Sequence, residues 1–261
     1  MARLEWDEAG SKLWETGLDR GVLYPLASNG TYDNGVSWEG LTSVNEQPSG
    51  SEPQKFYADN ITYANILSIE EFAATIEAYT YPDEFASCDG SASISDGIYI
   101  GQQSRQKFGF CYRTKIGNDV SEDLGYKIHI IYNCLAAPSD KNYETVNDSP
   151  ELIQFSWEVS TDPVKVTGHK PTATLVIDST KVSAANLKIL EDTLYGIDAA
   201  AFDATRTYAV GDYVTYQSKT YKCTTAVATA GEWDSSDWTE VENPNAKLPL
   251  PDEIATIITA G

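Results

Sequence analysis

Few side chains in this 261-residue sequence, apart from its carboxylates, could support acid–base, nucleophilic or metal chemistry. There are 2 histidines and 4 cysteines against 39 Asp and Glu. The sequence has no Gly-x-Ser-x-Gly elbow, His-Glu-x-x-His zinc motif, Cys-x-x-Cys pair or glycine-rich phosphate loop. His129 lies in an apolar segment, which favours a hydrogen-bonded histidine of the core. His169 lies in a turn-like segment. We therefore expect no catalytic residue, no metal site and no cofactor.

Carboxylate pairs leave one route to hydrolysis open, because glycosidases place two Asp or Glu side chains across the scissile bond. Glu70, Glu71 and Glu77 are close enough in sequence to share one face of a helix. A solvated face with a capping role explains them more simply, since no second motif accompanies them. The expectation is a protein that binds or assembles and is not an enzyme.

Charge and composition restrict the possible partners. The 18 Lys and Arg against 39 Asp and Glu give a formal net charge of -21, a field that repels phosphate backbones and anionic lipid headgroups. Hydrophobic residues make up 41% and aromatic residues 11%, which is typical of a globular protein. Residues 1–7 lack the apolar core of a secretory signal, and no apolar run approaches the ~20 residues that cross a bilayer. We expect a soluble protein without a membrane partner.

The cysteines indicate the redox state. They are widely spaced, and three of the four lie within apolar stretches where free buried thiols are common. We therefore expect reduced thiols and assembly in a cytoplasmic compartment. The four residues are Cys88, Cys111, Cys134 and Cys223.

Alternation of apolar and polar residues with a period of two dominates the sequence and predicts a sheet. In residues 108–116 one face is aromatic and the other partly charged, and residues 152–159 alternate in the same way. Both segments are typical of half-buried strands. Further strands are expected at 21–26, 36–41, 94–100, 127–135 and 172–178.

Two helices are expected to interrupt these strands. The first begins at Ser68, which has the capping-box spacing to Glu71, and ends before Pro82. Its core face would consist of Ile69, Phe72, Ala73 and Ile76. The second begins after Ser183 as N-cap and ends at Gly196. Its core face would consist of Leu187, Leu190 and Leu194. The mixture predicts an α+β fold that is mainly β, with an antiparallel sheet.

Two stretches mark the organisation of the chain. Residues 42–60 contain two prolines and little alternation, so we expect a long loop of the kind that is functional or bound to a partner. Small residues at 199–203 and polar residues at 242–245 flank a Tyr-rich, strand-like segment. A small separate module is expected between these flanks.

Seven short strings are spread over the first 198 residues: GLTSV at 40–44, YADN at 57–60, EAYTYPDE at 77–84, GQQ at 101–103, FGFCYRT at 108–114, GYKIH at 125–129 and NDSP at 147–150. In their content and order they resemble the major tail tube protein of long-tailed, siphovirus-type bacteriophages. LPLPDEI at 248–254 is similar to the C-terminal arm of that family. The resemblance assigns residues 1–198 and 247–261 to a tail tube domain.

The resemblance implies a structural virion protein. Its fold would be an antiparallel β-sandwich or barrel with a flanking helix, and its assembly a stack of homo-hexameric rings. The tube would conduct DNA during ejection without specific binding, and an acidic lumen would keep phosphates from sticking. A tape measure protein would fill the lumen, and tail terminator and baseplate proteins would close the ends. The protein would assemble in the host bacterial cytoplasm and reside in the virion tail.

Two segments are expected to join successive rings. The loop at 42–60 and the arm at 248–261 are both long, contain prolines and are poorly patterned for independent packing. Segments of that kind gain order from a neighbouring subunit.

Residues 206–241 contain the strings YAVGDYVTY at 208–216, TYKC at 220–223 and WTEV at 238–241. Through these strings the segment resembles a small carbohydrate-binding module of the chitin-binding type. The module would be an all-β insertion at 199–246, displayed outward, with host cell-wall polysaccharide as a possible ligand. One departure is Thr224-Thr225-Ala226, which stands where such modules carry two adjacent tryptophans.

The aromatic residues of this insertion divide into core and surface. Val214, Tyr216, Tyr221, Cys223 and Trp238 are expected to fill its small core. Tyr213 and Trp233 remain as exposed candidates for stacking on sugar rings. The alternative for these two residues is an outer decoration with weak or no glycan contact.

Two other classes of function remain open from the sequence. One is a secreted carbohydrate-binding or adhesion protein, against which the absence of a secretion signal counts. The other is a glycan-cleaving enzyme with an appended binding module, for which no local motif argues. Rings or tubes of purified protein would distinguish the structural subunit from both.

Overall fold

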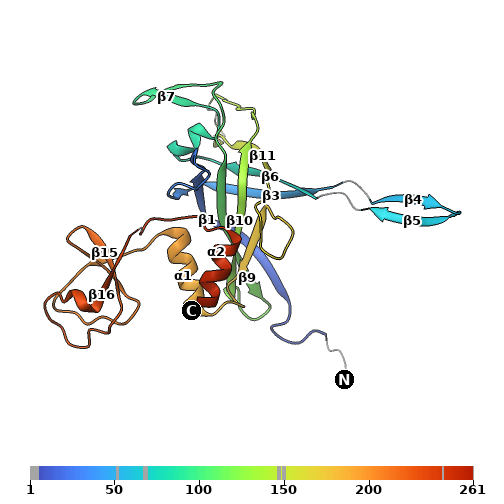
Figure 1. The fold of residues 1–261 in the computed structure, drawn as a ribbon. Helices are drawn as coiled ribbons and strands as arrows, with labels where there is room; N and C mark the ends of the chain where they lie inside the picture. The colour runs from blue at the N-terminus through green and yellow to red at the C-terminus, as the bar shows by residue number, and fades with distance from the viewer. Residues whose placement is uncertain are drawn as a thin grey trace.

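An antiparallel sheet of eight strands organises most of the chain, and its strands come from both halves of the sequence (Figure 1). The computed structural model describes residues 6–50, 53–66, 70–145, 148, 151–242 and 244–260. Strand order is β2-β1-β9-β10-β11-β6-β3, and β12 pairs with β10 beside this path. The strands are β1 (Leu13–Pro25), β2 (Val36–Trp38), β3 (Leu41–Ser49), β6 (Glu71–Ala78), β9 (Phe108–Asn118), β10 (Gly125–Ala136), β11 (Phe155–Thr161) and β12 (Thr174–Asp178).

Both faces of this sheet are buried, because alternate residues of the central strands belong to different cores. On one face Phe110 packs against Trp38, with ring centroids 5.5 Å apart, and Trp38 packs against Trp157 at 5.6 Å. On the other face Ile128 and Ile130 of β10 pack against residues of the two helices. Both sets of alternate side chains in the central strands are therefore buried, each in a different apolar core.

The sheet curls so that β1 approaches β3, the strand at the far end of the path. Gly21 permits this approach. A Cβ atom there would clash with Leu41 Cδ1 and would lie 2.8 Å from the carbonyl oxygen of Trp38. The expected mainly β fold with an antiparallel sheet and a flanking helix is therefore confirmed.

The helices α1 (Ala184–Tyr195) and α2 (Pro251–Ala260) lie side by side against one face of the sheet (Figure 1). The predicted α1 is confirmed, since the Ser183 hydroxyl accepts from Asn186 N at 3.3 Å and Gly196 ends the helix at φ 86°. Leu190 and Leu194 are buried, and Leu187 packs against the same cluster.

The C-terminal arm, expected to be poorly patterned for independent packing, packs against the rest of the chain. Leu248 and Ile254 are buried in the cluster that joins α1, α2 and β10. The Tyr132 hydroxyl donates to Pro249 O at 3.1 Å, and Thr167 N and Oγ1 donate to the carboxylate of Asp252. Apolar residues at helical spacing give α2 a packing face, so the arm belongs to the core that α1 and β10 form in the same chain.

The predicted helix from residue 68 to about 81 is wrong. Strand β6 occupies Glu71–Ala78, with Ala74, Ile76 and Ala78 buried at a period of two. It pairs with β11 on one side and β3 on the other. Two ladders of main-chain hydrogen bonds outweigh a local helix signal. Ser68 and Ile69, on which that signal rested, lie outside the described residues.

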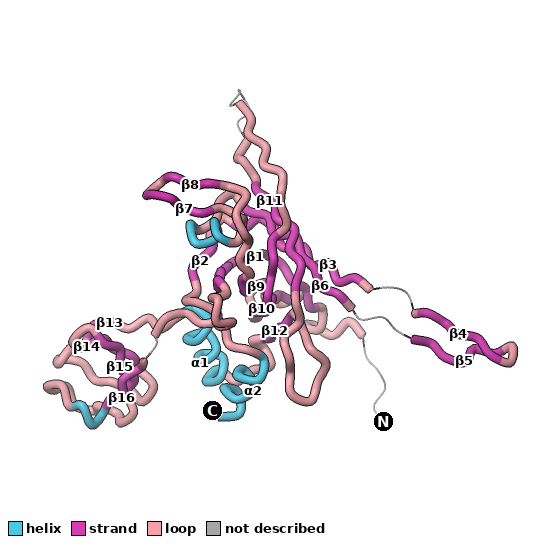
Figure 2. The backbone as a smooth tube through the Cα atoms, turned by 45° about the horizontal axis from the view of Figure 1, so that its top comes forward, coloured by secondary structure: helices cyan, strands magenta, loops and turns pink. Residues whose placement is uncertain are grey.

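The expectation of a long loop at 42–60 is also wrong, because most of these residues form strands. β3 runs through Pro48, which an edge strand tolerates, and β4 (Gln54–Ala58) pairs with β5 (Ile61–Ile66). Residues 51–52 lie outside the described residues. The β4–β5 hairpin projects from the sheet (Figures 1 and 2). A second hairpin, β7 (Ala92–Ser95) and β8 (Ile98–Ile100), follows the short helix η1 (Asp83–Ser87).

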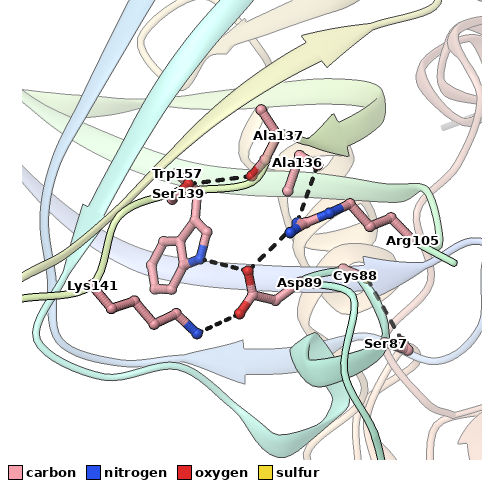
Figure 3. Close-up of polar contacts among 9 residues, drawn as sticks. All are labelled: Ser87, Cys88, Asp89, Arg105, Ala136, Ala137, Ser139, Lys141 and Trp157. Carbon is pink, nitrogen blue, oxygen red and sulfur yellow. Dashed lines mark hydrogen bonds and ion pairs between the residues drawn. The ribbon is translucent and has the colours of Figure 1, made fainter. Parts of the chain in front are cut away.

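A buried carboxylate ties the turn after η1 to the end of the main sheet (Figure 3). Asp89 Oδ1 accepts from Trp157 Nε1 at 3.2 Å and from Arg105 Nη1 at 3.5 Å, and its Oδ2 accepts from Lys141 Nζ at 2.6 Å. Burial opposes the charge of Lys141, but the hydrogen bond to Asp89 and the attraction of its carboxylate raise the pKa of Lys141. Three separate segments are thus held by one side chain.

All four cysteines are free and buried, as the sequence indicates. Burial raises the pKa of Cys88 to about 11 and that of Cys111 to about 12, so both thiols are protonated at neutral pH. Among the described residues, no helix is long and apolar enough to span a bilayer.

Candidate functional site

Residues 199–246, the inserted module, contain a second sheet with a core of its own. The strands are β13 (Ala200–Ala201), β14 (Tyr213–Tyr216), β15 (Lys219–Cys223) and β16 (Trp238–Val241), and η2 (Ser235–Asp237) precedes β16. Gln217 and Ser218 have φ values of 49° and 64°, which is the geometry of a tight hairpin turn between β14 and β15. Figure 1 shows this sheet set to one side of the main sheet.

Aspartates shape two of the loops around this sheet. Asp203 accepts from Thr205 N and Oγ1 at 2.8 and 2.7 Å, and Asp234 accepts from Ser236 N and Oγ at 2.9 and 2.8 Å. These hydrogen bonds lower the pKa of both carboxyl groups. The loops that carry Arg206 and Trp233 are therefore held by local turns as well as by packing.

The core of the module is aromatic. Trp238, Val214 and Cys223 are buried together with Tyr208. Tyr216 and Tyr221, expected in the core, are half-buried, and Tyr221 packs against this cluster. Burial raises the pKa of Cys223.

Trp233 was expected to be an exposed ring, but the structure places it half-buried among other rings. It stacks on Tyr216 at 4.2 Å and on Trp238 at 5.1 Å, with interplanar angles of 9° and 16°. Phe202 and Tyr221 meet it edge-on at 5.1 and 4.9 Å. Much of the surface of the Trp233 ring packs against these neighbouring rings, so the area on which a sugar could stack is limited.

Tyr213, the second stacking candidate, lies where the module meets α1. Its ring is half-buried, with Lys188 Nζ of α1 5.2 Å from the centroid and Lys222 Nζ 5.7 Å from it. Lys188 Nζ also donates to Asp192 Oδ2 at 2.8 Å. Tyr213 thus takes part in a cation–π contact between the module and α1. Sequence reasoning missed Lys188, because no local pattern links a helix residue to a strand of an insertion.

Residues 224–226, which stand where related modules carry two adjacent tryptophans, are exposed. Thr224 N and Thr225 N donate to Asp237 O at 2.8 and 3.2 Å, so the segment is fixed beside η2. Its side chains offer hydroxyl groups and no ring. No group of three or more His, Cys, Asp and Glu suited to a metal ion occurs in the described parts of the chain.

Trp238→Ala is expected to unfold the module and leave the main sheet intact. The side chain is buried and contacts the rings of Phe202, Tyr208 and Trp233. Loss of a large buried aromatic costs ~3–5 kcal/mol, which exceeds what so small a core can lose. Limited proteolysis should cut within 199–246 and leave the main domain (residues 1–198 and 247–261) folded, with its two segments held together by the packing of the C-terminal arm. Val210→Ala, at an exposed position of the same module, should resist cleavage like the wild type.

Comparison with known proteins identifies one family within the chain. Residues 201–247 match the model of carbohydrate-binding module family 5/12. No curated protein matches the chain. A chain of the six-fold symmetrised cryo-EM structure of the anti-feeding prophage (AFP) baseplate is 10% identical, with a TM-score of 0.34, and the match covers 62% of this chain and 95% of that chain. A TM-score of this size does not establish a shared fold. The resemblance of the inserted module to a carbohydrate-binding module is therefore confirmed, and that of the remaining residues to a tail tube protein stays a prediction.

Proposed function

We propose that the chain is a structural subunit of a bacteriophage tail tube whose inserted module binds a glycan of the host surface. The observation that carries the structural role is the β4–β5 hairpin. Five large apolar side chains of this two-stranded hairpin are exposed. They are Phe56, Tyr57, Ile61, Tyr63 and Ile66. Monomeric proteins rarely present so many such side chains on one projection, so a neighbouring subunit is the natural place for them.

The main-chain groups of the hairpin support the same proposal. β4 and β5 pair only with each other among the described strands, so each has an unpaired outer edge. Proteins protect such edges by pairing or covering them, and closure of a ring removes them. A homo-hexameric ring, stacked into a tube, would cover edges and apolar side chains together.

Several of the strings shared with the tail tube family lie on the elements that build the main sheet. FGFCYRT belongs to β9, GYKIH to β10, and EAYTYPDE runs from β6 into η1. Of the NDSP string, Asp148 alone is among the described residues. The assembled subunit would reside in the virion tail, with a tape measure protein in the lumen of the tube and tail terminator and baseplate proteins at its ends. DNA passes an acidic wall without being bound, in line with the net charge of -21.

Electron microscopy of the purified full-length protein tests the structural role. Rings or tubes would support it. Monodisperse monomers would favour the alternative, a carbohydrate-binding or adhesion protein that uses the module as its binding end. Retention of the same sample on chitin or on host cell-wall polysaccharide tests the glycan role separately.

Deleting residues 199–243 is expected to leave tube formation intact and to give thinner tubes. The ends of the insertion meet in space, since Ile197 N donates to Pro244 O at 2.8 Å, so a short join does not strain the main domain. Retaining Ala246 keeps its carbonyl as the acceptor for Gly35 N. Negative-stain images give the tube diameter. An aggregated deletion variant would contradict the proposal that the insertion is a separate domain.

A further inference from the structure

A pocket of about 340 Å³ lies between α1 and the inserted module, and neither of the stacked rings of Tyr216 and Trp233 lines it. Its lining comes from α1, the linker after α1, β13, the loop before β14 and β14 itself. The volume is at the lower end of the range for small-molecule sites, roughly 300–1,000 Å³. The pocket is therefore of a size for the end of an oligosaccharide. Its polar members include Lys188, Asp198, Arg206, Asp212 and Tyr213.

The lining combines donors, acceptors and small apolar residues. Lys188 and Arg206 can donate hydrogen bonds, Asp198 and Asp212 can accept them, and Ala200 and Ala201 are small and apolar. Sugar hydroxyl groups both donate and accept, and the C–H faces of a sugar ring suit a small apolar surface. Two positive and two negative side chains balance each other, which favours a neutral ligand over a phosphate or carboxylate.

Two of these polar groups are held in place by hydrogen bonds to neighbouring residues of their own segments. Lys188 Nζ donates to Asp192 Oδ1 at 3.0 Å and Oδ2 at 2.8 Å, and an ammonium group has three N–H donors. Asp212 Oδ2 accepts from Ala209 N at 2.8 Å and has further acceptor capacity. Groups that are fixed before binding lose less conformational entropy when a ligand arrives.

We propose that this pocket binds the end of a neutral glycan, and that helix α1 of the main domain contributes Lys188 to the site. The proposal rests on the glycan-binding role of the inserted module and assigns that role a location. The binding site then spans both domains. It differs from a surface platform of exposed tryptophans, which Thr224-Thr225-Ala226 does not provide.

Titration calorimetry of the full-length protein tests this site. The probes are the neutral disaccharides N,N′-diacetylchitobiose, cellobiose and maltose, with glucuronic acid as an anionic sugar. Lys188→Ala and Asp198→Ala should each weaken binding of the best neutral probe about tenfold, as loss of a hydrogen bond to a charged group does. Lys219→Ala is the matched control, since this exposed lysine pairs with Glu240 and lies outside the lining. Its affinity should equal that of the wild type, and thermal unfolding should show that all variants are folded.

The outcomes separate this inference from the function on which it rests. If the wild type binds a neutral probe and both pocket variants bind it equally well, the pocket assignment is wrong and the glycan-binding role stands. If only glucuronic acid binds, and Lys188→Ala abolishes that binding, the neutral ligand class is wrong. If the wild type binds no probe and is not retained on polysaccharide, the pocket assignment and the glycan-binding role both fail.

Discussion

Asp89→Ala is expected to lower the free energy of unfolding of the main domain by about 3 kcal/mol, because it leaves charged and polar partners without their acceptor in a buried site. The carboxylate accepts from Trp157, Arg105 and Lys141 (Figure 3). Trp157 is fully buried, so its indole N–H would lose its partner where water does not reach. The two cations keep some contact with solvent, which places the expected loss at the lower end for a broken buried pair.

Urea unfolding followed by tryptophan fluorescence measures this effect. The matched control is Asp162→Ala, which removes an exposed carboxylate that pairs with Lys107. Pairs exposed to solvent contribute ~0–1 kcal/mol, so the control should unfold close to the wild type. An Asp89→Ala variant that unfolds at the same urea concentration as Asp162→Ala would show that the buried carboxylate does not stabilise the fold.

The role of Asp89 illustrates what the sequence does not reveal. Its neighbours Cys88 and Gly90 suggest an ordinary turn, and nothing nearby in sequence points to Arg105, Lys141 or Trp157. The three partners come from different segments that meet only in the folded chain. Contacts of this kind depend on topology, which local patterns do not encode.

Strands were predictable where burial follows a local period. β9 and β10 alternate between two apolar environments, and the same alternation is visible in their sequences. β6 was not predictable, because its residues favour a helix locally and become a strand through pairing with β3 and β11. The helix α1 was predictable from its cap, because Ser183 satisfies a main-chain donor within the same segment.

The inserted module shows the same division between local and distant information. The burial of Trp238 follows from the strand pattern around it. The surroundings of Trp233 and Tyr213 do not follow from such a pattern. Trp233 lies in a loop before η2 and stacks on Tyr216, and Tyr213 contacts Lys188 of α1. Residues whose contacts lie outside their own strand or loop are therefore the ones for which sequence reasoning provided the least information.

Replacing Tyr57 and Tyr63 together with serine is expected to abolish tube formation and leave the subunit folded. Both side chains lie on the β4–β5 hairpin and are 68% and 77% exposed. Exposed substitutions change the free energy of unfolding by about 0.5 kcal/mol or less. An aromatic side chain buried at the centre of an interface contributes ~2 kcal/mol or more, so the double variant should weaken each contact strongly.

We expect a complete loss of tubes because the same contact is repeated between all subunits. In a symmetric assembly every subunit makes the same contact, so the weakening recurs at each addition to the tube. Tyr143→Ser, at a position that is 69% exposed and far from the hairpin in sequence, is the matched control and should form tubes. Circular dichroism would verify the fold of both variants, and electron microscopy would count tubes. Normal tubes from the double variant would mean that the hairpin does not join subunits, and the exposed apolar side chains would then need a partner other than a second copy of this chain.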